Sequence, residues 1–343
     1  MKSGLFDLEV KLSFIFMPII FMLAVPFIRK GFSDTILKTF VAGCIAGCLF
    51  CLSRSAYNYI SETRNIEEFF YAKLSPHFHP SYFALYLNLA ILITIKQSFS
   101  KWKQMTFLHK IIRLAIISFF LLIVLLLNSK AGILITIFSV ILFLLVMLFS
   151  ARKKTAGIIA IISILGLSFT FWNTVPGLKN RFIISLKSLQ TYSQKTINPE
   201  DGTLQRLVIW RHSMAIIQEN LMTGVGTGDV RQELDRIYME EKFTHGAKIH
   251  LNAHNQFLQT TIAIGITGLI CLLFIIISLM TTGIRRKDSV MFFFALILFL
   301  NFQVESMLET QAGTVFTAFF ISFFALKNDS PEKKKETNKS QTY

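Results

Sequence analysis

Residues 111–150 read IIRLAIISFFLLIVLLLNSKAGILITIFSVILFLLVMLFS, and this stretch decides the fold class. It is apolar over almost its whole length, and its only charged residues are Arg113 and Lys130. A run of about 20 apolar residues is long enough to cross a bilayer as a helix. The stretch therefore predicts two crossings joined by the tight turn Asn128-Ser129-Lys130. Helices are expected rather than barrel strands, because barrel strands alternate between apolar and polar residues.

The rest of the chain repeats this pattern. Of the 343 residues, 53% are hydrophobic and 16% are charged, against roughly 25% charged residues in soluble domains. The fold class predicted is all-α, a polytopic bundle of membrane helices. We expect nine spans, at about residues 11–28, 35–53, 80–96, 111–128, 131–150, 155–172, 255–280, 288–303 and 311–327.

These spans divide the chain into four parts. Residues 1–172 hold six spans, residues 173–254 form one long loop, residues 255–327 hold three spans, and residues 328–343 form a polar, lysine-rich tail that we expect to be disordered. The odd number of spans means either that one span escapes detection or that this start lacks helices present in relatives.

The basic residues set the orientation in the membrane. Every second connection is basic, and basic loops mark the cytoplasmic side. The clusters are Arg29-Lys30, Lys96 to Arg113, Arg152 to Lys154, Arg285 to Lys287 and Lys333 to Lys335. The C-terminus is then cytoplasmic, and residues 54–79, 128–130, 173–254 and 304–310 lie outside with the N-terminus. The net charge of +15 follows from this topology and from anionic membrane lipids, and nucleic acid is not an expected partner.

The long loop contains one predicted helix, Leu204–Asn220. Leu207, Trp210, Met214 and Ile217 fall on one stripe at helical spacing, which predicts an amphipathic helix lying on the membrane with its apolar side down. The segment Thr223-Gly224-Val225-Gly226-Thr227-Gly228 follows. Its glycines either simply end the helix or expose backbone N–H groups to an anion, as in a phosphate nest. A Walker motif is excluded, since no Gly-Lys-Ser/Thr follows.

Two arginines of this helix are candidate phosphate ligands. Arg206 lies four residues before Trp210 and therefore on the same face, whereas Arg211 lies about 140° further around the helix. A guanidinium suits phosphate because it stays charged and donates parallel hydrogen bonds. The alternative is that both arginines contact lipid headgroups only.

His254 stands between the loop and the span predicted at 255–280. Histidine titrates near neutral pH, so it is suited to accept a proton from a hydroxyl nucleophile. His250, four residues earlier, gives a spacing that can hold a metal on one helix face. No glutamate follows His250, and the sequence offers no obvious third ligand beyond the more distant His245. We therefore predict no metal. A surface histidine without a role is the third interpretation.

These residues resemble a known family. His254-Asn255, nine residues and then Gly265-Ile-Thr-Gly268 resemble the signature of the O-antigen ligase and O-antigen polymerase superfamily. Arg206 to Trp210, followed by Gly224-Val-Gly226, resembles its loop motif. The resemblance covers about residues 75–325. Weaker similarities are His79-Pro80-Ser81-Tyr82, Asn128 to Gly132 with Lys130 in place of an arginine, and Glu305 to Gly313.

The resemblance implies a GT-C-like glycosyltransferase of the bacterial inner membrane, with its active site facing the periplasm and with no metal or cofactor. The donor would be a glycan on undecaprenyl diphosphate. The acceptor would be a hydroxyl of lipid A–core or of another glycan. The shared motifs do not separate ligases from polymerases or from protein-glycosylating members. Relatives commonly have more spans than are expected here.

The resemblance also implies roles for single residues. His254 would activate or orient the acceptor hydroxyl, and Arg206 would stabilise the charge that grows on the diphosphate as it leaves. The further residues expected to bind substrate are Arg211, Lys130, Asn255, Gly224, Gly226, His79 and Glu305.

Two other classes of function predict different sequence patterns. A lipid or polysaccharide transporter or flippase would bury charges inside its spans and interrupt pairs of helices near the midplane. The predicted spans contain almost no charged residues, which favours chemistry at the interface. A structural subunit without activity would leave the pattern around His254 and Arg206 unexplained.

Overall fold

The computed structural model describes residues 2–27, 31–151, 166, 183 and 202–327. Every element within these residues is a helix, which confirms the all-α class. The predicted span 155–172 lies outside the described residues except for Gly166, and the predicted disordered tail 328–343 lies wholly outside them.

Five described helices are long and apolar enough to cross a membrane. They are α3 (Phe32–Asn58, continued by the π-helical turn Tyr59–Thr63), α5 (Pro80–Lys101), α6 (Phe107–Leu126), α7 (Lys130–Ala151) and α13 (Gln256–Arg285). Each corresponds to a predicted span. The predicted spans 288–303 and 311–327 correspond to the shorter apolar helices α14 (Ser289–Phe302) and α15 (Gln311–Leu326).

The first predicted span, 11–28, corresponds to a shorter helix. The chain forms α1 (Lys2–Lys11), α2 (Ser13–Ala24) and a 3-10 turn, Val25–Phe27. Pro18 lies inside α2 and proline interrupts helical hydrogen bonding. Lys11 forms an ion pair with Glu309 at 3.4 Å, so the end of α1 lies beside the connection between α14 and α15.

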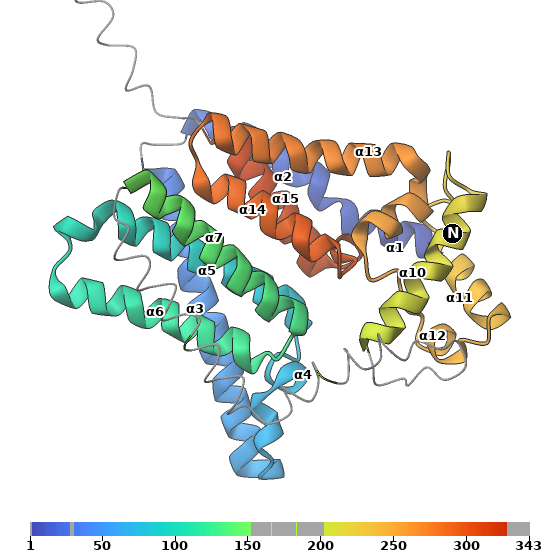
Figure 1. Ribbon diagram of the computed structural model, residues 1–343, viewed down its shortest axis with the longest axis horizontal. Helices are drawn as coiled ribbons and strands as arrows, with labels where there is room; N and C mark the ends of the chain where they lie inside the picture. Colours follow the sequence, from blue (N-terminus) through green and yellow to red (C-terminus); the bar gives the residue numbers. More distant parts are fainter. Residues whose placement is uncertain (1, 28–30, 152–165, 167–182, 184–201, 328–343) are drawn as a thin grey trace, which may run out of the picture.

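Several of the apolar helices pack around α5. This helix contacts α3, α6, α7 and α14, while α13 and α14 form an antiparallel hairpin and α15 packs on α2 (Figure 1). Phenylalanines fill the space between α14 and α15, where the Phe294 ring lies 5.4–5.9 Å from the rings of Phe316, Phe320 and Phe324. Aromatic rings bury large apolar areas and prefer such tilted contacts, so this layer fixes the two short helices that flank Glu305.

A second, smaller core lies at one end of the bundle. It is formed by α10 (Gly202–Glu219), α11 (Val230–Glu240), α12 (Thr244–Lys248) and the first turns of α13 (Figure 1). Tyr238 is its largest fully buried side chain, and its hydroxyl donates to the carbonyl of Leu251 at 3.2 Å. The segment before His254 is thereby anchored to α11.

The predicted helix of the long loop exists as α10, and most of its buried apolar residues lie off the predicted stripe. Val208, Ile209, Ile216 and Ile217 belong to the core shared with α11 and α13, and of these only Ile217 is in the stripe. Of the predicted stripe, Met214 is 46% exposed. Trp210 and Met214 instead line a pocket of about 450 Å³ with residues of α13 and α14. The helix carries two apolar faces, and the larger one packs on protein.

Helix α13 is broken near its start. Ile264 (φ −133°, ψ 20°) and Gly265 (φ 68°, ψ −163°) are not helical, so nearby backbone groups lose their helical partners. The turn after α10 supplies them. The N–H groups of Val225 and Gly226 donate to the carbonyls of Ile262 (2.8 Å) and Ala263 (2.9 Å). In return, the N–H of Ile266 donates to the carbonyl of Leu221 at 2.8 Å.

The break changes the interpretation of the predicted span 255–280. The uninterrupted part runs from residue 266 to residue 285, and these 20 residues form about 30 Å of helix. This length matches the hydrocarbon thickness of a bilayer. His254 therefore precedes a short helical segment rather than the crossing itself.

We predict that Gly265→Ala lowers the unfolding temperature of the purified protein. The backbone at this position has a conformation that is essentially restricted to glycine, worth about 1–3 kcal/mol of strain for other residues, and a Cβ here would collide with the carbonyl of Met222. The control is Gly43→Ala in α3, where a Cβ meets nothing within 4 Å and where alanine favours the helix. We call the contacts between the turn after α10 and the break in α13 the interlock. Equal unfolding temperatures for the two variants would contradict it.

Candidate active site

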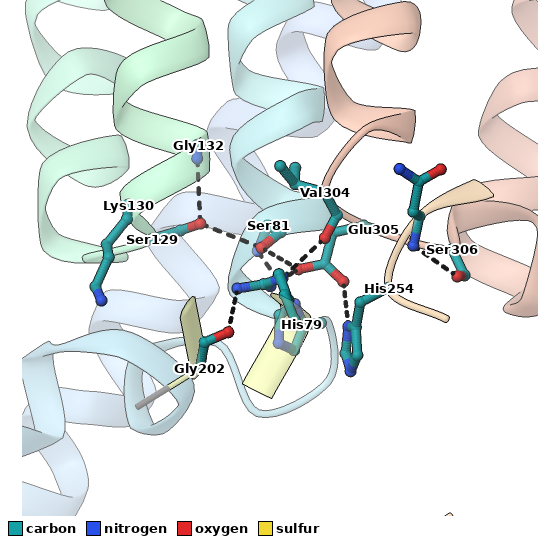
Figure 2. Close-up of polar contacts among 12 residues, drawn as sticks. His79, Ser81, Ser129, Lys130, Gly132, Gly202, His254, Val304, Glu305 and Ser306 are labelled. Carbon is teal, nitrogen blue, oxygen red and sulfur yellow. Dashed lines mark hydrogen bonds and ion pairs between the residues drawn. The ribbon is translucent and has the colours of Figure 1, made fainter. Parts of the chain in front are cut away.

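A buried carboxylate, Glu305, is the centre of the site. It follows the end of α14, and its side chain is 5% exposed. Its Oε1 accepts from Arg206 Nη2 at 2.7 Å and from Ser81 Oγ at 3.2 Å, while its Oε2 lies 3.2 Å from His254 Nδ1 (Figure 2). Three side chains from distant parts of the chain therefore share one negative charge.

Arg206 projects from the first turns of α10 and is fixed by three acceptors. Besides Glu305, its Nε donates to the carbonyl of Val304 at 3.1 Å, and its Nη1 donates to the carbonyl of Gly202 at 3.4 Å. The side chain is 28% exposed. The guanidinium is thus oriented by protein on one side and accessible on another.

His254 is held by the turn that begins α13. Its backbone is left-handed (φ 43°), and its N–H donates to Asn252 Oδ1 at 3.0 Å. The imidazole is 25% exposed. Figure 2 shows its second ring nitrogen on the side away from Glu305, where it faces no partner among the drawn residues.

Asn255 is used as a structural residue. Its Oδ1 accepts from the N–H groups of Phe257 and Leu258, which caps α13. Its Nδ2 donates to the carbonyl of Gln303 at 3.1 Å, and its backbone N–H donates to Ser306 Oγ at 3.2 Å. Both ends of the amide are therefore engaged by protein, and Asn255 ties His254 to the segment that carries Glu305.

His79 and Lys130 border the same cluster. His79 caps α5, with its Nδ1 accepting from the N–H of Ser81 at 3.4 Å. Ser81 Oγ lies 3.1 Å from Ser129 Oγ in the turn between α6 and α7. The next residue, Lys130, places its Nζ 3.4 Å from Thr203 Oγ1 at the start of α10. The turn between α6 and α7 thereby meets the starts of α5 and α10 at one end of the bundle.

Comparison with known proteins identifies the central part of the chain. Residues 114–273 match the sequence model of a family described as O-antigen ligase. This region is similar to the O-antigen ligase and O-antigen polymerase superfamily. The match includes Lys130, Arg206 and His254 and ends before Glu305. None of the curated proteins compared with the chain matches it.

The match at residues 114–273 confirms the resemblance found in the sequence. Members of the family are glycosyltransferase-like enzymes, and the apolar helices agree with an integral membrane protein. The segments predicted to share one side of the membrane, 54–79, 128–130, 173–254 and 304–310, contribute His79, Ser129, Arg206, His254 and Glu305. The structure brings all five together: Arg206 contacts Glu305, and Figure 2 shows the other three around the same carboxylate.

Other predicted site residues lie apart from this cluster. Arg211 is exposed on α10, and within the described part of the chain it does not appear among the contacts of Glu305. Gly224 and Gly226 have φ angles of 69° and 95°. Their N–H groups donate to the carbonyls of Asn220 and Ala263, so they are not free for an anion as a phosphate nest requires. Their role is to join α10 to α13.

The two histidines considered for a metal contact different carboxylates. His250 Nδ1 lies 2.6 Å from Asp235 Oδ2, whereas His254 contacts Glu305. Among the described residues, no group of three His, Cys, Asp or Glu side chains is placed to hold a metal ion.

Three serines of the site carry no predicted role. Ser81 and Ser129 bond to each other, and Ser306 accepts from Asn255. All three lie inside the motifs of the family resemblance, so the motifs could have identified them as residues of the site. Their partners could not be read from the sequence, since each bond joins residues at least 48 positions apart.

The electrostatics of the site favour an ionised Glu305. Burial raises the pKa of Glu305, but the hydrogen bond with His254 and the positive charge of Arg206 outweigh it and lower the pKa from 4.5 to about 2. Burial lowers the pKa of His79, an effect that the charge of Glu305 partly opposes. His79 is therefore neutral at neutral pH, and Glu305 carries the negative charge of the cluster.

The lowered pKa of Glu305 predicts a specific dependence of stability on pH. A carboxylate whose pKa is lower in the folded state stabilises the fold above its ordinary pKa and loses this contribution as the pH falls through the folded value. The wild-type protein should therefore lose stability between about pH 4.5 and pH 2. Thermal unfolding of purified wild type and Glu305→Gln, followed over this range, measures the difference. It should narrow as the pH falls, and a constant difference would contradict the assignment.

Proposed function

We propose that the protein is an O-antigen ligase-like glycosyltransferase. It transfers a glycan from undecaprenyl diphosphate to an acceptor hydroxyl, with lipid A–core as the acceptor, at the periplasmic face of the bacterial inner membrane. The observation that carries the proposal is the convergence of His254 and Arg206 on one buried carboxylate, in a chain whose central region matches the O-antigen ligase family.

Arg206 binds the leaving diphosphate in this proposal. A guanidinium donates five N–H bonds, and protein acceptors engage three of its nitrogens through one contact each. Donors therefore remain for phosphate oxygens on the accessible side. Lys130 supplies a second positive charge near the start of α10. Both charges would stabilise the negative charge that develops as the glycosidic bond breaks.

His254 serves as the base. Its second ring nitrogen takes the proton of the acceptor hydroxyl, and the hydroxyl oxygen forms a bond to the anomeric carbon of the donor sugar. The bond from that carbon to the diphosphate oxygen breaks, and its electron pair stays on the diphosphate. General base catalysis of this type contributes about 10²–10⁴-fold to the rate.

The orientation of the α14–α15 hairpin supports a site that faces the periplasm. Glu305 lies in the connection of this hairpin, after the 14 residues of α14. The opposite end of the same hairpin is basic: Lys327 pairs with Asp288 at 2.6 Å, and Arg286 donates to the carbonyl of Phe324. The positive-inside rule makes that end cytoplasmic.

The break in α13 bears on the transporter alternative. Interrupted helices near the midplane are typical of transporters, where they line a binding site. Here the freed groups of Ile262, Ala263 and Ile266 bond to the turn after α10 rather than to a second broken membrane helix. The break therefore joins the long loop to the bundle, which favours an enzyme with an interfacial site.

We predict that His254→Ala and Arg206→Ala each reduce glycan transfer by about 10²-fold or more. Arg211→Ala, an exposed arginine five residues further along α10, is the matched control and should retain transfer. The measurement is surface glycan in a deletion strain that expresses each variant at equal level. Near-normal glycan with both active-site variants would sink the proposal.

The glycans of the deletion strain itself distinguish the ligase from a polymerase. Unmodified lipid A–core with accumulated lipid-linked polymer is the result expected for a ligase. A core capped with one repeat unit would instead assign the protein as a polymerase that joins lipid-linked repeat units.

A further inference from the structure

The two oxygens of Glu305 serve different partners. Oε1 accepts from Arg206 and Ser81, and Oε2 contacts His254. We propose that Glu305 is a positioning residue that does not touch substrate: it fixes the proton of His254 on Nδ1, and it orients Arg206 until the donor diphosphate arrives. This inference rests on the proposed function, since it assigns what controls the two reacting residues.

The first role follows from the chemistry of the contact. An ionised carboxylate can only accept hydrogen bonds, so Nδ1 must be the nitrogen that carries the proton when His254 is neutral. The lone pair is then on the other nitrogen, which Figure 2 places on the side away from Glu305. Without the carboxylate, the neutral imidazole would exchange between its two tautomers, and only one of them could accept a proton from the acceptor hydroxyl.

Glu305 also acts after the proton has moved. When the outward nitrogen takes the hydroxyl proton, the imidazole becomes positively charged with Nδ1 only 3.2 Å from Oε2. The ion pair forms away from bulk water, since the carboxylate side chain is 5% exposed, and buried charges interact more strongly than exposed ones. The interaction strengthens along the reaction, so Glu305 lowers the barrier through His254.

In its second role, Glu305 orients Arg206 but also weakens the binding of the donor. The 2.7 Å ion pair orients the guanidinium of Arg206, but the same negative charge repels the diphosphate that Arg206 must bind. The carbonyls of Val304 and Gly202 still hold Arg206 when the charge is removed. A neutral side chain of the same shape should therefore leave Arg206 in place and make the site more attractive to the anionic donor.

These two roles predict opposite effects of one substitution. In Glu305→Gln, kcat should fall by about 10- to 100-fold, because His254 loses its anionic partner, while the KM for the donor should stay equal or decrease. Loss of a purely structural residue would not improve donor binding. The assay uses purified full-length protein in lipid nanodiscs with a glycan on undecaprenyl diphosphate and lipid A–core.

Two further variants make the test decisive. Glu305→Asp keeps the charge and should recover part of the lost kcat, with a donor KM at or above that of Glu305→Gln. Glu309→Gln is the matched control, because Glu309 lies four residues further on and pairs with Lys11 rather than with His254 or Arg206. Its kcat should stay within about twofold of wild type.

The outcomes separate this inference from the proposed function. Unchanged kcat in Glu305→Gln, or an increase in donor KM in a folded Glu305→Gln protein, overturns the positioning role. If Glu305→Gln does not fold, Glu305→Asp decides: no recovery of kcat above the His254→Ala level overturns the role. Wild-type protein that transfers no glycan, or His254→Ala that transfers normally, contradicts the proposed function itself.

Discussion

The site depends on one constraint, the satisfaction of a buried carboxylate. Burying an unpaired charge in a protein interior costs several kcal/mol of folding free energy. The ionised Glu305 is therefore stable inside the protein only when its partners are in place. Arg206 comes from α10, His254 from the segment before α13 and Ser81 from α5. Because these segments are far apart in the chain, the charge can be satisfied only when the helices have assembled.

A second constraint fixes the long loop to the membrane bundle. The break in α13 exposes backbone groups that must be paired in a low-dielectric environment, and the turn after α10 pairs them. Gly224 and Gly265 are required because a Cβ at either position would meet backbone of the other segment. The interlock holds α10 beside α13, which is what sets Arg206 and His254 on either side of Glu305.

The sequence predicted the membrane helices well, since continuous apolar runs have few alternatives. Arg206, His254 and Glu305 were also named, through their motifs. Their arrangement was out of reach: Arg206 and Glu305 are 99 residues apart, and no periodicity reports such a contact. The sequence left open whether the glycines end α10 or form an anion nest, because a Gly-x-Gly pattern is the same whether its N–H groups are free or bonded. The buried face of α10 was missed because that helix is apolar on two sides.

The most direct measurement is a double-mutant cycle on the stability of Arg206 and Glu305, with Arg206→Met, Glu305→Gln and the double variant compared at neutral pH. Breaking a buried pair on one side leaves the other charge uncompensated. We therefore expect the free energy of unfolding to fall less in the double variant than in the two single variants added together, by about 1–3 kcal/mol. Additive losses would show that Arg206 and Glu305 do not share the buried charge, and would contradict the central claim.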